Sequence, residues 1–183
     1  MSGTQIGSNL PGWLIVRLKR QFGLAYFVET GTSSGETAEL GAIAFERAWT
    51  IELFAGRLAK ARERLAEYPN ARILVGDSPT VLQALLPDLD KPTFFWLDAH
   101  YSGGPDVPRV ECPLLEELRI LGGFAENYAI VIDDARLFVS PPPVPHNASQ
   151  WPTMGAIAEA RPAGSYLAVI DDTLVITPAL FVP

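Results

Sequence analysis

The chain has 183 residues, 48% of them hydrophobic, which suffices for one globular domain with a substantial core and not for two ordinary ones. Its formal charge of −7 argues against a general nucleic-acid binder, and no apolar run approaches the roughly 20 residues of a membrane helix. The single cysteine, Cys112, cannot form an internal disulfide, which indicates a reducing, cytoplasmic setting. Together these features predict one cytoplasmic domain over residues 1–183, without nucleic-acid or membrane partners.

Helix and strand patterns alternate along the chain. Apolar spacing predicts helices at 12–22, 35–45, 55–68, 79–86, 113–121 and 153–160, and short β-type runs predict strands at 25–28, 48–53, 72–75, 93–97 and 129–132. Repeated strand-helix units imply parallel pairing with right-handed crossovers. In the helix over 55–68, Arg57, Lys60 and Arg64 lie opposite the apolar face and are expected to face solvent.

The end of the chain breaks this rhythm. Strands expected at 166–170 and 173–176 are separated only by Asp171 and Asp172, which can join antiparallel neighbours but cannot supply a parallel crossover. The predicted fold class is therefore α/β, with a doubly wound, mostly parallel Rossmann-like sheet and a C-terminal antiparallel hairpin. The proline-rich segment 139–152 is either a lid over a site or a stiff connection.

Five of the predicted strands end in a carboxylate. Parallel strands present their carboxyl ends at one edge, where open α/β folds bind their ligands. We therefore expect a functional site that contains Glu29, Glu52, Asp77, Asp98 and Asp133.

The loop after the first strand carries a local motif in which Gly31 and Gly35 allow a tight turn next to a helix start. By itself this pattern also fits a plain strand-to-helix turn. Glu52 follows Gly31 by 21 residues, close to the roughly 20-residue offset of an acid that binds ribose hydroxyls in nucleotide folds. Together the two features predict a nucleoside cofactor.

Charge narrows the choice of cofactor. No Gly-Lys-Ser/Thr follows the loop, which argues against ATP, and a dinucleotide would bring its pyrophosphate against Glu29 and Glu36 with no basic residue between positions 26 and 45. S-adenosylmethionine carries a sulfonium and an ammonium and no phosphate, so an acidic site suits it. The alternatives are an NAD-dependent oxidoreductase, although Ser33 stands where its loop needs glycine, and a non-catalytic nucleoside-binding domain.

The residues resemble the motif series of class I S-adenosylmethionine-dependent methyltransferases from about Ala25 to Thr177. The motifs concerned are Glu29-Thr30-Gly31 with Gly35, then Glu52, Gly76-Asp77-Ser78 and Trp96-Leu97-Asp98-Ala99-His100. This resemblance implies that Glu29 and Gly31 lie beside the methionine moiety, that Glu52 holds the ribose, and that Asp77 with Ser78 borders the adenine. It also implies a cofactor site that includes Thr30, Ser33, Gly35, Leu53, Gly76 and Asp98. For each acid the alternative is a helix cap or a solvated strand end.

Asp98, Asp133 and Asp134 form a second group. Three adjacent carboxylates repel one another unless a cation or protons intervene, and oxygen ligands favour Mg²⁺, Mn²⁺ or Ca²⁺. The arrangement resembles the metal-dependent O-methyltransferases, including the macrocin O-methyltransferase type that acts on sugar hydroxyls. The insert Tyr101-Ser102-Gly103-Gly104-Pro105 departs from that pattern. Alternatively, Asp133 or Asp134 caps a loop and Asp98 contacts cofactor or substrate directly.

His100 is a candidate acceptor for the proton of a substrate hydroxyl, or else a loop histidine bonded to a nearby carboxylate. Tyr101, His146 and Trp151 are candidates to line the acceptor pocket, with Trp151 as an alternative loop anchor. The function predicted from these features is methylation of a hydroxyl on a small molecule or sugar, with Asp98 and His100 as catalytic residues and a divalent metal as a candidate assistant. The oligomeric state stays open, with a homo-oligomer as one option.

Overall fold

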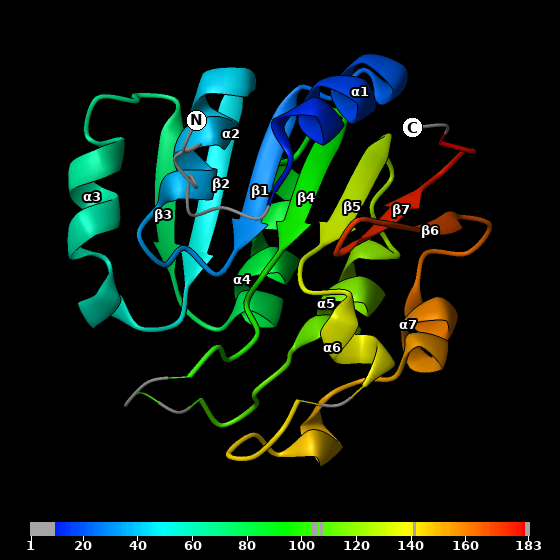
Figure 1. The fold of residues 1–183 in the computed structure, drawn as a ribbon. Helices are drawn as coiled ribbons and strands as arrows, with labels where there is room; N and C mark the ends of the chain where they lie inside the picture. The colour runs from blue at the N-terminus through cyan, green and yellow to red at the C-terminus, as the bar shows by residue number, and fades with distance from the viewer. Residues whose placement is uncertain (1–9, 104–105, 107, 141, 182–183) are drawn as a thin grey trace, which may run out of the picture.

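The computed structural model describes residues 10–103, 106, 108–140 and 142–181. Within them the chain forms a seven-stranded sheet in the order β3-β2-β1-β4-β5-β7-β6 (Figure 1). The strands are β1 Tyr26–Thr30, β2 Arg47–Glu52, β3 Ala71–Val75, β4 Thr93–Leu97, β5 Tyr128–Ile132, β6 Tyr166–Ile170 and β7 Thr173–Thr177. The first five strands pair in parallel, while β7 is antiparallel to both β5 and β6. The predicted fold class, including the terminal hairpin, is confirmed.

Helices cover both faces of the sheet, as Figure 1 shows. They are α1 Gly12–Phe22, α2 Glu36–Ala44, α3 Ala59–Leu65, α4 Ser78–Leu85, α5 Leu114–Leu121, α6 Arg136–Val139 and α7 Met154–Ala160, with short 3-10 turns at Ala55–Arg57, Leu86–Asp88 and Ala148–Gln150. One apolar layer packs α1 and α2 on the sheet, and the other packs α4, α5 and α7 on its opposite face. No helix in the described part of the chain is long and apolar enough to cross a membrane.

The central strands of the sheet contribute side chains to both apolar layers. Every residue of β1, β4 and β5 is buried. Successive side chains point to opposite faces, so Phe27 and Phe94 stack at 5.7 Å on the α1 side while Val28 and Phe95 belong to the other layer. The same alternation fixes the direction of the side chains at the strand ends, and the functional site is built from these side chains.

The structure differs from the sequence prediction in two elements. The helix predicted over 55–68 is wrong in extent, because a 3-10 turn at Ala55–Arg57 precedes α3 and the helix ends at Leu65, a few residues before Pro69. The four-residue helix α6 was not predicted, since so short a segment carries no readable period. Residues Gly104, Pro105 and Pro141, which belong to segments discussed above, lie outside the described residues.

Candidate functional site

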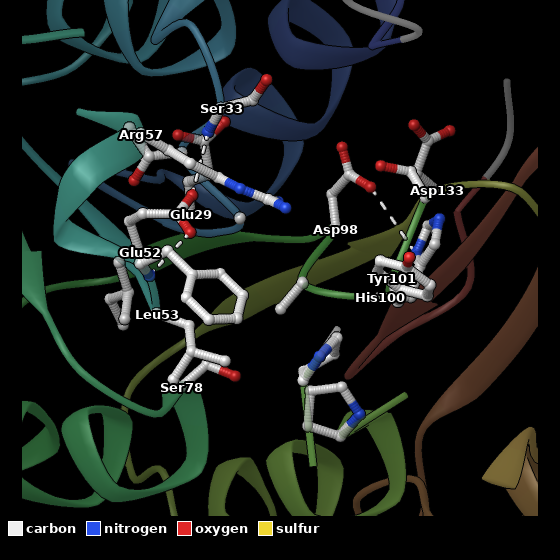
Figure 2. A pocket seen from close by; sticks show the side chains of 18 of the residues that line it. Glu29, Ser33, Glu52, Leu53, Arg57, Ser78, Asp98, His100, Tyr101 and Asp133 are labelled. Atoms are coloured by element: carbon white, nitrogen blue, oxygen red, sulfur yellow. Dashed lines mark hydrogen bonds and ion pairs between the residues drawn. The ribbon is translucent and has the colours of Figure 1, made fainter. Parts of the chain in front are cut away.

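A pocket of about 570 Å³ opens at the carboxyl ends of the parallel strands. All five strand-tip acids line it: Glu29, Glu52, Asp77, Asp98 and Asp133. Figure 2 shows Glu29, Ser33 and Glu52 on one side of this space and Asp98, His100 and Asp133 on the other. The sheet topology therefore brings together acids that are up to 104 residues apart in the sequence.

Glu52 joins the loops after β1 and β2. Its carboxylate accepts hydrogen bonds from the backbone N–H of Ser33 at 3.2 Å and of Phe54 at 3.0 Å. The Ser33 backbone is left-handed, with φ of 48°, which turns its N–H toward the carboxylate. Glu52 is thus fixed at the pocket wall, and it is a bound partner of both loops rather than a solvated strand end.

Glu29 lies deeper, with 1% of its surface exposed. The hydroxyl of Thr50 donates to it, and the Thr32 and Thr50 hydroxyls are 2.6 Å apart. Burial, aided by the charges of Asp98 and Glu52, raises the pKa of the Glu29 carboxyl well above its usual range. A cation placed in the pocket would offset that cost and favour the ionised form of Glu29.

The tip of β3 forms the third part of the wall. Asp77 stands at the N-terminus of α4, but its side chain does not cap the helix backbone and instead accepts the hydroxyl of Thr80 at 3.2 Å. Beside it, Ser78 donates to Glu117 at 2.6 Å. Burial raises the pKa of Glu117 to about 7. In sequence Glu117 is one more acid within an amphipathic helix, so its place beneath the site was not predicted.

His100 lies between two carboxylates. Its Nε2 is 2.9 Å from Oδ2 of Asp134 and its Nδ1 is 3.6 Å from Oδ1 of Asp98, while only 5% of its side chain is exposed. Burial lowers the pKa of His100, but the hydrogen bond to Asp134 and the surrounding carboxylates outweigh this effect and raise it overall. Burial also raises the pKa of Asp98, to about 7. Both shifts favour the protonated forms of these two groups.

The structure does not support the predicted metal site at Asp98, Asp133 and Asp134. In the ranges given above, no three His, Cys, Asp or Glu side chains are arranged to hold an ion. Asp134 instead bonds to His100 and, at 2.6 Å, to Arg136, and Asp133 accepts the backbone N–H of Asp134 at 2.8 Å. The contact of Asp133 therefore fits a role as a loop cap better than a role as a metal ligand.

Glu111 joins the two long loops beside the site. Its buried carboxylate accepts hydrogen bonds from Trp151 Nε1 at 2.9 Å and from the Asn147 backbone at 3.0 Å, and it lies 3.3 Å from His146 Nδ1. The Trp151 ring in turn packs on the ring of His100, with centroids 5.4 Å apart. Tyr101 lines the pocket, but His146 and Trp151 do not, so Trp151 is a loop anchor.

Replacing Glu111 by glutamine should loosen the segment over 142–151. A hydrogen bond to a charged group contributes about 1.5–3 kcal/mol, so amide hydrogen exchange there should accelerate by about 10- to 150-fold. Glu159→Gln, at an exposed position on α7, should leave exchange unchanged. Equal protection of the segment in the Glu111 variant and the unmodified protein would refute the anchoring role.

Two basic residues that were expected to face solvent, Arg57 and Lys60, line the pocket. Lys60 is exposed there, as predicted, whereas Arg57 is half-buried. The Arg57 side chain lies over the ring of Phe54, 4.9 Å from its centroid, and extends toward Asp98 in Figure 2. Its Nε is also 3.2 Å from Asp106 in the loop after β4. The broken helix explains the error, since a continuous helical period does not apply across residue 58.

The pocket lining lacks some residues that were predicted for the site and contains others that were not. Thr30 and Gly35 do not line the pocket: Thr30 is buried in the sheet, and Gly35 is the left-handed N-cap of α2, where a Cβ would meet Ala61 at 3.0 Å. The other residues predicted for the cofactor site do line it. Lining residues that were not assigned from the sequence include Thr32, Ser34, Thr37, Ile51, Phe54, Pro108, Val110 and Pro113. These mostly follow the strand tips and lack a chemical signature of their own.

Comparison with known proteins gives structural matches only, because no family model and no curated protein sequence matches the chain. An O-methyltransferase from Bacillus cereus, solved with S-adenosylhomocysteine, superposes with a TM-score of 0.60 at 15% identity, over 97% of this chain and 82% of that one. TomG, an O-methyltransferase of tomaymycin synthesis from Streptomyces achromogenes solved with S-adenosylmethionine, gives 0.56 at 21% identity, over 96% and 83%.

A third match is the methyltransferase PaMTH1 from Podospora anserina, solved with S-adenosylhomocysteine. It has a TM-score of 0.63 at 17% identity, over 93% of this chain and 79% of that one. These identities are low, but the similarity extends over nearly the whole chain. The protein has the class I S-adenosylmethionine-dependent methyltransferase fold, as the sequence motifs predicted.

Proposed function

We propose that this protein is an S-adenosylmethionine-dependent methyltransferase that methylates a hydroxyl group of a small molecule or sugar. The observation that carries the proposal is the convergence of Glu29, Glu52 and Asp98 on one pocket at the carboxyl edge of this fold. Such an acidic wall attracts and stabilises a cationic methyl donor, whereas it would repel a pyrophosphate. We further propose that the activity belongs to a single cytoplasmic domain over residues 1–183.

The cofactor fits the pocket in one order along the sheet edge. Glu52 binds the ribose hydroxyls, and Leu53, Gly76, Asp77 and Ser78 border the adenine. Gly31, Ser33 and Glu29 lie on the methionine side. In this position the sulfonium faces Asp98, which lies across the space from Glu29 (Figure 2).

The acceptor occupies the side of the pocket formed by His100, Tyr101 and Ser102, with Pro108 and Val110 as its apolar wall. Its hydroxyl oxygen attacks the methyl carbon as the carbon–sulfur bond breaks and the bonding electron pair passes to sulfur, giving S-adenosylhomocysteine. The hydroxyl proton passes to the Asp98–His100 pair. Alignment of oxygen, methyl and sulfur supplies most of the acceleration, up to about 7–11 kcal/mol in well-oriented systems.

Glu52→Gln should weaken binding of S-adenosylhomocysteine by about 10- to 150-fold, because a charged hydrogen bond contributes about 1.5–3 kcal/mol. Isothermal titration calorimetry measures this, with Glu46→Gln as the matched control at an exposed position whose ion pair with Lys91 lies outside the pocket. Unchanged affinity in a folded Glu52 variant would contradict the ribose assignment.

The same calorimeter distinguishes the classes of function. S-Adenosylhomocysteine should bind and NADH should not, whereas the reverse result would favour an oxidoreductase. A radiolabelled methyl-transfer screen over sugars, phenols and other hydroxylated acceptors then separates an enzyme from a non-catalytic cofactor binder.

A further inference from the structure

The three acids Asp98, Asp133 and Asp134 require positive charge or protons among them, because adjacent carboxylates in a partly buried site repel one another. A divalent cation would supply this charge if it lay between the carboxylates with oxygen distances of about 2.0–2.6 Å. The side chain found between Asp98 and Asp134 is the imidazole of His100, with one ring nitrogen facing each of them.

Asp134 is held by donors on both of its oxygens. Oδ2 lies 2.9 Å from His100 Nε2, and Oδ1 accepts from Arg136 Nη1 at 2.6 Å. Arg136 is also bonded by Asp172 in the turn of the terminal hairpin, whose carboxylate accepts from the guanidinium and from the backbone N–H of Arg136. An ion bound to Asp134 would have to share its oxygens with these two donors.

The backbone reinforces this orientation. Asp134 has a left-handed φ of 57°, and its N–H donates to Asp133 Oδ1. The Trp151 ring packs on His100, and only a small part of the imidazole is exposed. The ring is therefore confined between the carboxylates by its neighbours.

We propose that the imidazole of His100 and the guanidinium of Arg136 take the place of a divalent cation among Asp98, Asp133 and Asp134, so that this site works without a metal ion. The part that concerns methyl transfer rests on the function proposed above, while the part that concerns ion binding does not. His100 then has two roles, since it balances the carboxylates and holds Asp98 facing the pocket.

Mn²⁺ titration of the full chain, followed by the electron paramagnetic resonance of the free ion, tests the proposal directly, because carboxylate sites for Mg²⁺ also take Mn²⁺. The unmodified protein should show no saturable site. His100→Ala vacates the space between Asp98 and Asp134, and it should bind one Mn²⁺ at a saturable site, with an affinity at least about tenfold above the detection limit of the titration. Adding Asp98→Asn to that variant should abolish the gain.

His146→Ala is the matched control, because it removes the other histidine, which contacts Glu111 and not the three acids, and it should gain no site. His100→Ser serves as a second replacement should the alanine variant be unstable. The proposal is overturned by a site in the unmodified protein that Asp134→Asn removes, or by folded His100 variants that bind no ion.

Methyl-transfer activity provides a second, independent test of the proposal. Methyl transfer by the unmodified protein should be insensitive to a chelator and to added Mg²⁺, and a loss of turnover restored by Mg²⁺ would overturn the proposal. Failure of the chain to bind S-adenosylhomocysteine would refute the proposed function alone, since the Mn²⁺ titration does not depend on it.

Discussion

Replacing His100 by asparagine should lower the kcat of methyl transfer by about 10²–10⁴, the usual contribution of a positioned proton acceptor. The protonated imidazole balances the surrounding carboxylates and holds Asp98 facing the pocket as the group that takes up the hydroxyl proton, and asparagine cannot carry that charge. The KM for S-adenosylmethionine should change little, because the ribose and adenine contacts come from β2 and β3. Steady-state kinetics on the purified variant measures both constants.

The pH profile separates this role from a purely structural one. The pKa of Asp98 is raised to about 7 by burial, and the pKa of His100 is also raised, so at lower pH the pair is fully protonated and cannot accept a proton. The rate of methyl transfer by the unmodified protein should therefore fall as pH decreases through about 7. His146→Asn should keep this profile, and a His100 variant with normal kcat and an unchanged profile would show that the pair is not the acceptor.

Replacing Gly31 by alanine should abolish cofactor binding and destabilise the fold. Gly31 has φ of 89°, and a Cβ at this position would lie 2.1 Å from the carbonyl oxygen of Asp98. The left-handed backbone costs about 1–2 kcal/mol for an alanine and overpacking about 1–3 kcal/mol, so we expect a loss of about 2–5 kcal/mol. For a chain of this size each kcal/mol lowers Tm by about 2–4 °C.

Differential scanning calorimetry, combined with S-adenosylhomocysteine titration, tests the Gly31 variant. Gly56→Ala is the matched control, because a Cβ there meets no atom within 4 Å. A Gly31 variant as stable as the Gly56 variant and still able to bind the cofactor would contradict the close approach of the two strand-tip loops.

The sequence predicted the fold well because its signals are local. Each buried strand is a short apolar run, and the two-residue spacing at Asp171 and Asp172 permits only an antiparallel hairpin. Parallel pairing then places the acids at one edge, so the pocket could be anticipated from the strand ends. The resemblance to methyltransferase motifs added the fold family, which the structural matches support.

The incorrect predictions concern side chains whose surroundings come from residues distant in the sequence. The break at residue 58 turned Arg57 into the pocket, and no helical period could reveal it. Three acids in the sequence look like an ion site until His100 is found between two of them. Glu111 and Glu117 were overlooked because an acid in a loop or an amphipathic helix is ordinarily solvated, whereas here each is buried with hydrogen-bond partners.

A crystal structure of the protein with S-adenosylhomocysteine tests most directly whether the acidic strand edge is a methyl-donor site. The predicted result is a ligand whose ribose hydroxyls bond to Glu52, with its sulfur between Glu29 and Asp98 and the acceptor space open toward His100. A ligand bound elsewhere on the protein, with Glu52 still bonded only to the backbone of Ser33 and Phe54, would contradict the account.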